Sequence, residues 1–132
     1  MHIVLCMDER NGMLFNRRRV SSDRAVSSRV LQHVTGRLLV SNYSAKLFED
    51  AEVCIDDSLL ENAGQGDTCF VENLDFVQCL DRIATITVYR WNRHYPADTK
   101  LPQHILDAFT LTESEDFPGN SHDVITEEKY VK

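Results

Sequence analysis

The stretch of sequence that decides the fold is Val88–Pro102, which reads VYRWNRHYPADTKLP. Its first residues end a run, 83–91, in which most side chains are β-branched or aromatic. Such side chains favour an extended backbone. The residues that follow include Pro96, Asp98 and Pro102, which are typical of turns. The sequence therefore predicts a long strand that runs into a polar turn, and the other segments are arranged around this strand.

The residues before this strand alternate between strand-like and helix-like segments. His2–Met7 is a continuous apolar run of strand length, as expected for a central strand covered on both faces. Ser21 and Ser22 offer N-cap oxygens to a first helix with valines at 26, 30 and 34, and Gly36 stands where a left-handed C-cap belongs. Further strands are predicted at 13–16, 38–40, 53–55 and 68–71, short helices at 59–63 and 74–80, and a helical turn through 47–48.

The residues after the long strand indicate consecutive strands. Ala108–Leu111 and Val124–Val131 alternate as antiparallel edge strands do, and the acidic segment 113–116 with residues 118–120 is predicted to be the loop between them. Strand, helix and strand in repetition, followed by strands alone, predict an α/β fold. We expect a single domain over residues 1–132, a three-layer sheet that is parallel in the centre with antiparallel C-terminal strands.

Cysteine usage and hydropathy bound the class of protein. The cysteines at 6, 54, 69 and 79 stand singly in apolar runs, without the spacing of a zinc site. We expect small buried side chains in a reducing cytoplasm. The apolar start is too short for a signal peptide, and no segment approaches the roughly 20 apolar residues of a membrane span. These features predict a soluble, cytoplasmic protein with no membrane partner and no metal.

The net charge of −7 is unevenly distributed. Residues 1–46 hold eight Lys and Arg against three Asp and Glu, a balance of +5, whereas residues 47–132 hold six against eighteen, a balance of −12. Either the two parts lie against each other and neutralise, or the basic part uses Arg17–Arg19 to hold phosphate or nucleic acid. The acidic total works against binding of polyanions, so a nucleic-acid partner is not expected.

In the order of its motifs the chain resembles dihydrofolate reductase nearly from end to end. The opening strand followed by Asp8–Gly12 is similar to the family's first strand and loop. Residues 97–102, ADTKLP, resemble the family's Gly-Asp-Thr-x-Phe-Pro turn, and residues 40–44, VSNYS, look like its Met-Gly-Arg-x-Thr segment. The resemblance implies a dihydrofolate reductase-like fold with NADPH as cofactor. It also places Asp23 where the family keeps the acid that helps to protonate the pterin.

Several positions depart from the family pattern. After the strand that here is Thr68–Val71, the family has a glycine pair, because only glycine lets backbone N–H groups approach the cofactor's phosphates closely. This chain has Glu72 and Asn73 there, and Asp56 and Asp57 stand near the position of the cofactor's 2′-phosphate. The arginine for the folate tail and the tryptophan of the loop over the substrate have no counterpart. These departures predict a domain without standard NADPH-dependent folate reduction.

Several functions stay open at this stage. The first is binding of a small nucleotide or pterin-like ligand in the cleft at the carboxyl ends of the parallel strands. The alternatives are a non-catalytic assembly module, an active NAD(P)H-dependent reductase, and a metal-independent nuclease or phosphate-binding protein that uses the N-terminal arginines.

Residue by residue, Asp23 is the candidate catalytic group, although an Asp in the first turn of a helix also complements the helix dipole. No role is expected for the solitary loop histidines, and an exposed edge strand at Val124–Val131 makes a homodimer possible. The candidate ligand-binding residues are Met7, Asn16, Arg19, Asn42, Ser44, Glu72, Asn73 and Tyr89.

Overall fold

The computed structural model describes residues 1–49 and 51–132, and it confirms the predicted α/β fold. A seven-stranded sheet has the order β5-β4-β6-β1-β7-β10-β9. The strands from β5 to β7 pair in parallel, and β10 pairs antiparallel with both β7 and β9. The strand bounds are β1 His2–Met7, β4 Leu38–Val40, β5 Cys54–Ile55, β6 Thr68–Phe70, β7 Thr85–Arg90, β9 Thr110–Phe117 and β10 Ile125–Val131.

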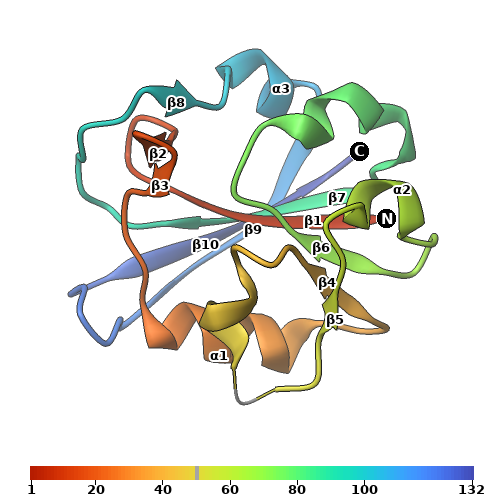
Figure 1. The fold of residues 1–132 in the computed structure, drawn as a ribbon. Coiled ribbons are helices and arrows are strands. Elements are labelled where there is room, and N and C mark those ends of the chain that lie inside the picture. The colour runs from red at the N-terminus through yellow and green to blue at the C-terminus, as the bar shows by residue number, and fades with distance from the viewer. Residues whose placement is uncertain (50) are drawn as a thin grey trace.

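Helices cover both faces of this sheet, so the predicted three layers are present. Figure 1 shows α1 on one face and α3 on the other. The helix bounds are α1 Arg24–His33, α2 Leu59–Asn62 and α3 Gln103–Asp107, with 3₁₀ helices η1 Ala45–Phe48 and η2 Asp75–Arg82. Among the described helices, none combines the length and the apolar character needed to cross a bilayer.

Two apolar cores lie on the two faces of the sheet, and β1 contributes to both. Ile3, Leu5 and Met7 face the core beneath η2 and α3, whereas Val4 belongs to the core beneath α1. Side chains of a strand alternate between faces, so a strand covered on both sides needs an uninterrupted apolar run. Val26 and Val30 are the buried residues of the α1 stripe.

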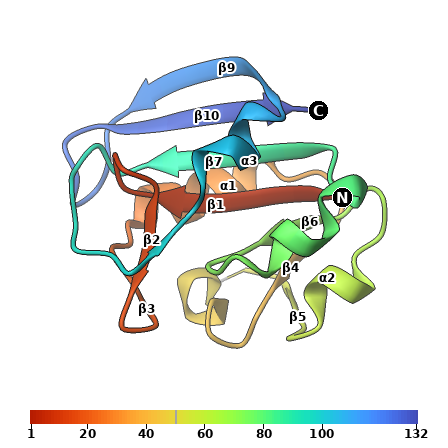
Figure 2. The ribbon, with the colours of Figure 1, turned by 90° about the horizontal axis from the view of Figure 1, so that it is seen from above.

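A small second sheet stands beyond the carboxyl end of β1, as Figure 2 shows. It has the order β3-β2-β8, with bounds β2 Gly12–Phe15, β3 Arg18–Arg19 and β8 Thr99–Lys100. Asn16 and Arg17 connect β2 to β3 with φ values of 51° and 63°, the left-handed conformation that a tight hairpin turn requires. Arg17 therefore lies in the turn of a β-hairpin, and Arg18 and Arg19 form its second strand.

The caps of α1 differ from those predicted. Asp23, and neither Ser21 nor Ser22, is the N-cap, because its carboxylate accepts from the Ala25 N–H. The helix ends at His33 with Val34 as its C-cap, so Gly36 lies beyond it. Gly36 does have a positive φ of 82°. Ser and Asp are both suitable N-cap residues by type, and Asp23 is the one that also accepts from the backbone N–H groups of residues 120 and 121.

The C-terminal prediction was wrong in three places. Residues 113–116 lie within β9 rather than in a loop. The short helix α3 was not expected. The strand predicted at Val124–Val131 is β10, which is enclosed between β7 and β9, so β9 is the edge strand on the C-terminal side of the sheet. Residues 110–116 of β9 are exposed and only Phe117 is buried. This strand therefore lacks the alternating apolar residues from which a strand is predicted.

Candidate functional site

The candidate site lies where β1, β4 and β6 end, because the carboxyl ends of parallel strands meet at one edge of the sheet. A cavity of about 20 Å³ lies there between α1, η1 and the β2–β3 hairpin. This volume has room for about one water molecule. The polar residues that line it are Arg19, Ser21, Ser22, Asp23, Ser27, Glu72 and Trp91.

Glu72, at the end of β6, has hydrogen-bond partners for both of its carboxylate oxygens. Its carboxylate accepts from Arg19 Nε at 2.7 Å and from Arg19 Nη2 at 3.0 Å, and it also accepts from the Ser44 hydroxyl at 2.7 Å. The side chain of Glu72 is 12% exposed and that of Arg19 is 25% exposed. The hydrogen bond to Glu72 raises the pKa of Arg19 above its usual value. Arg19 and Glu72 therefore form one wall of the cavity through a bidentate guanidinium–carboxylate contact.

Arg19 is held in place by Tyr43, in the loop between β4 and η1. The Arg19 backbone N–H donates to the Tyr43 hydroxyl at 2.9 Å, and Arg19 Nη2 donates to the Tyr43 carbonyl at 3.2 Å. The guanidinium also stacks on the Tyr43 ring, 4.4 Å from its centroid. The hairpin, the β4 loop and the end of β6 are thus joined through one arginine side chain.

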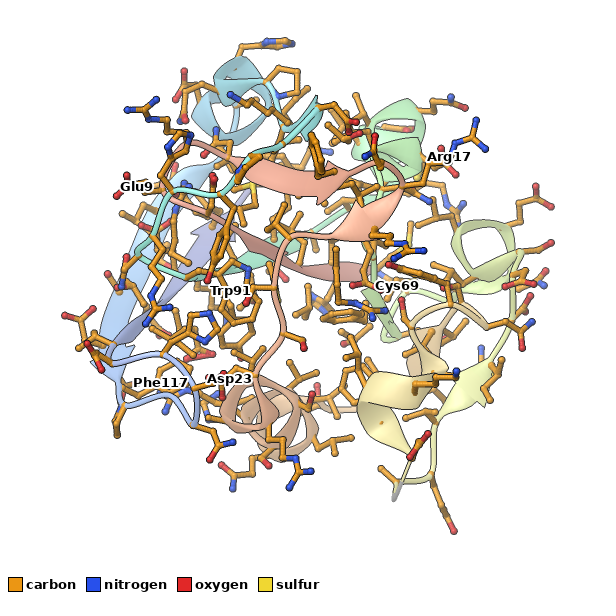
Figure 3. The ribbon with its side chains drawn as sticks, turned by 60° about the vertical axis from the view of Figure 1, so that its left-hand side comes forward. Glu9, Arg17, Asp23, Cys69, Trp91 and Phe117 are labelled. Atoms are coloured by element: carbon orange, nitrogen blue, oxygen red, sulfur yellow. The ribbon has the colours of Figure 1, made fainter. Side chains whose placement is uncertain are left out.

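Asp23 lies at the start of α1 with no exposed side-chain surface. Its carboxylate accepts from the backbone N–H groups of Ala25, Asn120 and Ser121 and from His122 Nδ1 at 2.9 Å. Burial alone would raise the pKa of Asp23, but the hydrogen bonds from His122 and from these backbone groups hold it far below its ordinary range. Figure 3 shows Asp23 at the start of α1 near Trp91, with Arg17 well away from both. Asp23 is therefore an ionised acceptor that joins α1 to the β9–β10 loop.

A larger, open hollow of about 550 Å³ lies on the other side of Glu72. The charged residues that line it are Asp57, Glu61, Glu72, Asp75 and Arg82. Arg82 already donates to the carbonyl oxygens of two residues of the α2 segment, at 60 and 63. Among the described residues, no cluster of three or more His, Cys, Asp or Glu has the geometry to hold a metal ion.

The remaining predicted residues lie outside the cavity. Met7 is buried in the core, and the hydroxyl of the buried Tyr89 donates to Glu127. Asn42 donates through its backbone and side-chain nitrogens to Asp57, and these bonds lower the pKa of Asp57. Asn16 lies in the hairpin turn, and Asn73 lines the larger hollow. The structure thus brings Arg19 and Glu72 together at the cavity that Asp23 also lines, and Ser44 joins them through its bond to Glu72.

The sequence analysis gave no role to His122, which the structure buries at the cavity's edge. Its ring stacks on Trp91 with 4.6 Å between centroids, and its Nε2 contacts the hydroxyls of Ser21 and Tyr95. Apart from its neighbour Ser121, the hydrogen-bond partners of His122 lie 27 to 101 residues away along the chain, so no local sequence pattern predicts this arrangement.

The uneven charge is paired within the molecule. Arg29 bonds to Glu115 and Glu127, and Arg37 bonds to Asp67. Together with the pair formed by Arg19 and Glu72, these contacts join the basic first third to the acidic remainder, as the first of the two charge alternatives predicted. Arg17 and Arg18 stay exposed.

No family model matches the chain, and no curated protein matches it. Among solved structures, the fold is similar to that of a dihydrofolate reductase from Enterococcus faecalis in complex with NADP(H) and RAB-propyl. The match covers 98% of this chain and 95% of that chain, with a TM-score of 0.68 and 9% sequence identity. The chain therefore has a dihydrofolate reductase-like fold, as its motif order predicted. At this identity the likeness concerns the fold alone.

Proposed function

We propose that this domain binds a small ligand at Glu72, in the cleft at the carboxyl ends of the parallel strands, and does not carry out standard NADPH-dependent folate reduction. The observation that carries the proposal is the position of Glu72, whose carboxylate lies between the small cavity and the open hollow. A largely buried carboxylate at a strand-end cleft is a strong anchor for a polar ligand.

The charges of the hollow argue against a dinucleotide. Four acidic residues line it, and its one arginine, Arg82, already donates to backbone carbonyl oxygens. Two unit charges of the same sign 4 Å apart repel by about 4 kcal/mol at an effective dielectric constant of about 20. The residues at this position do not fit a pyrophosphate, which needs backbone N–H groups and positive charge. This mismatch supports a ligand other than NADPH.

The contact between Arg19 and Glu72 suggests the chemistry of that ligand. Arg19 presents two N–H groups of a planar guanidinium to the two carboxylate oxygens. The 2-amino-pyrimidine edge of a pterin or a guanine presents the same pair of donors, so it can replace the guanidinium on Glu72. Arg19, once displaced, is free to pair with a phosphate or carboxylate on the same ligand. A pterin-like compound or a small guanine nucleotide fits both requirements.

Calorimetric titration with GMP, pterin-6-carboxylate, dihydrofolate, NADPH and NADH tests the proposal. We expect GMP or pterin-6-carboxylate to bind, and Glu72→Gln to weaken that binding at least about tenfold, since a charge-assisted bond is worth about 1.5–3 kcal/mol. Glu61→Gln, which removes an exposed carboxylate from the wall of the hollow, is the matched control. Micromolar binding of NADPH with turnover of dihydrofolate would refute the proposal, and so would no effect of Glu72→Gln.

The cellular location and the oligomeric state of the protein are proposed from its thiols and from its exposed edge strand. All four cysteines carry free thiols, which fits the expected reducing cytoplasm. At the C-terminal edge of the sheet a homodimer would pair through β9, whose Glu113, Glu115 and Asp116 would bring like charges together in an antiparallel pairing. We therefore propose a domain that does not pair through this edge at neutral pH.

A further inference from the structure

Three side chains near the start of α1 form a continuous hydrogen-bonded chain. Ser21 Oγ lies 2.9 Å from His122 Nε2, and His122 Nδ1 lies 2.9 Å from Asp23 Oδ2. An ionised carboxylate only accepts, so Nδ1 of the neutral imidazole carries the proton and Nε2 is left as an acceptor. The Ser21 hydroxyl therefore donates to His122. This is the order of contacts that activates a serine nucleophile.

The imidazole is fixed in this orientation. The His122 side chain is 3% exposed and stacks on Trp91 at an interplanar angle of 23°. Asp23 is fixed in turn by backbone N–H groups from both α1 and the β9–β10 loop. A base needs such an orienting partner to hold the correct tautomer. Asp23 is accordingly a positioning residue for His122.

Trp91 supplies an independent observation. It is 2% exposed and lines the same cavity as Ser21. Within residues 1–49 and 51–132, its indole Nε1–H is the buried side-chain group without a hydrogen-bond partner. Buried donors are normally paired, so an unpaired one beside a cavity calls for an acceptor that enters the cavity. A single oxygen atom matches both the volume of about 20 Å³ and this donor.

We propose that Ser21, His122 and Asp23 form a hydrolytic triad that cleaves esters of short carboxylic acids. Ser21 Oγ forms a bond to the ester carbonyl carbon as its proton passes to His122 Nε2. The carbonyl oxygen becomes an oxyanion in the cavity and accepts from Trp91 Nε1–H. The bond to the leaving alcohol then breaks, and the alcohol takes the proton from His122. Water repeats these steps on the acyl-serine and releases the carboxylic acid.

The cavity admits the carbonyl oxygen but not the acyl chain. An acetyl ester therefore has the least to accommodate outside the cavity and is the substrate of choice for a test. The Tyr95 hydroxyl lies 3.1 Å from His122 Nε2 and competes with Ser21 for this acceptor. Glu72 lines the same cavity but makes no contact with the three residues, so weaker ligand binding in Glu72→Gln and lost acetylation in Ser21→Ala are separate results.

The test uses 4-nitrophenyl acetate with the full chain, measuring release of 4-nitrophenolate and mapping acetylated peptides by mass spectrometry. We expect an acetyl group on Ser21 and a loss of at least about 100-fold in rate in Ser21→Ala, as general-base activation contributes about 10²–10⁴-fold. Ser28→Ala, the same substitution at an exposed position of α1, is expected to keep the native rate. Trp91→Phe is expected to lose about 100-fold, the effect of one oxyanion donor.

A second measurement separates positioning from folding. A proton on His122 Nδ1 that donates to Asp23 gives a downfield proton resonance in NMR spectra. We expect this resonance in the native protein and in Ser21→Ala, and its loss together with the acetylation in Asp23→Asn. Acetylation found only at other residues, none at all in the native protein, or an unchanged rate in Ser21→Ala overturns the proposal.

Discussion

Replacing Arg19 with methionine removes the guanidinium that lines the cavity and keeps most of the side chain's length. Each carboxylate oxygen of Glu72 then loses its bond to Arg19, and the only hydrogen-bond donor left is the Ser44 hydroxyl, which contacts Oε2. Its side chain is 12% exposed, so water replaces little of what is lost. The variant leaves an uncompensated carboxylate at the end of β6.

The expected loss follows from these contacts. Each charge-assisted hydrogen bond contributes about 1.5–3 kcal/mol, and breaking a buried ion pair costs about 3–5 kcal/mol. Arg19 is one quarter exposed, which reduces the effect. We expect Arg19→Met to lower the free energy of unfolding by about 2–4 kcal/mol. The double variant Arg19→Met with Glu72→Gln leaves no unpaired charge, so its loss should fall short of the sum by about 0.5–3 kcal/mol.

Urea unfolding followed by circular dichroism measures the free energy of unfolding of the native protein, the two single variants Arg19→Met and Glu72→Gln, and the double variant. Arg18→Met is the control, because Arg18 neighbours Arg19 on the same strand but is exposed, and such substitutions change stability by about 0.5 kcal/mol or less. A loss below about 1 kcal/mol in Arg19→Met, or strict additivity in the double variant, would refute the view that this pair is a desolvated contact.

Two further predictions concern the loop that meets α1. Gly119→Ala places a Cβ 2.5 Å from the His122 carbonyl oxygen and 2.9 Å from Asp23 Oδ2. We expect it to lower the free energy of unfolding by about 1–3 kcal/mol in the same urea assay. Gly66→Ala, whose Cβ meets nothing within 4 Å, is the control and should change this free energy by about 0.5 kcal/mol or less. Because the folded pKa of Asp23 is depressed, its stabilising effect is complete above the unfolded pKa of about 3.9 and declines as pH falls below it. The loss of stability between pH 5 and pH 3 should therefore be smaller in Asp23→Asn than in the native protein, and an equal loss in the two would contradict this attribution; Asp75→Asn removes an exposed carboxylate and serves as control.

Local patterns were sufficient for the central strands. β1 lies at the middle of the sheet and is buried from both sides, so its apolar run had one interpretation. β7 pairs with β1 in parallel and with β10 antiparallel, and its β-branched and aromatic residues again marked it clearly. The edge strand β9 was missed in part because its side chains face solvent, where polar residues are compatible with either loop or strand.

The site was less accessible to sequence reasoning. The position of Glu72 after β6 could be foreseen, because it depends on a strand end and a motif. Its pairing with Arg19 could not, since it depends on a hairpin that returns to the sheet 53 residues earlier in the chain. The same holds for His122, whose burial depends on Asp23, 99 residues away.

The bonds from the β9–β10 loop to Asp23 have a consequence for synthesis of the protein. During translation α1 leaves the ribosome long before residues 120–122, and the carboxylate that caps it then lacks most of its native donors. The strands that follow β7 must arrive before these donors are supplied, and such distant contacts form slowly. In a nascent chain halted before β9, α1 is therefore expected to be less stable than in the complete fold. Once the β9–β10 hairpin leaves the ribosome, its loop can bind Asp23 and stabilise α1.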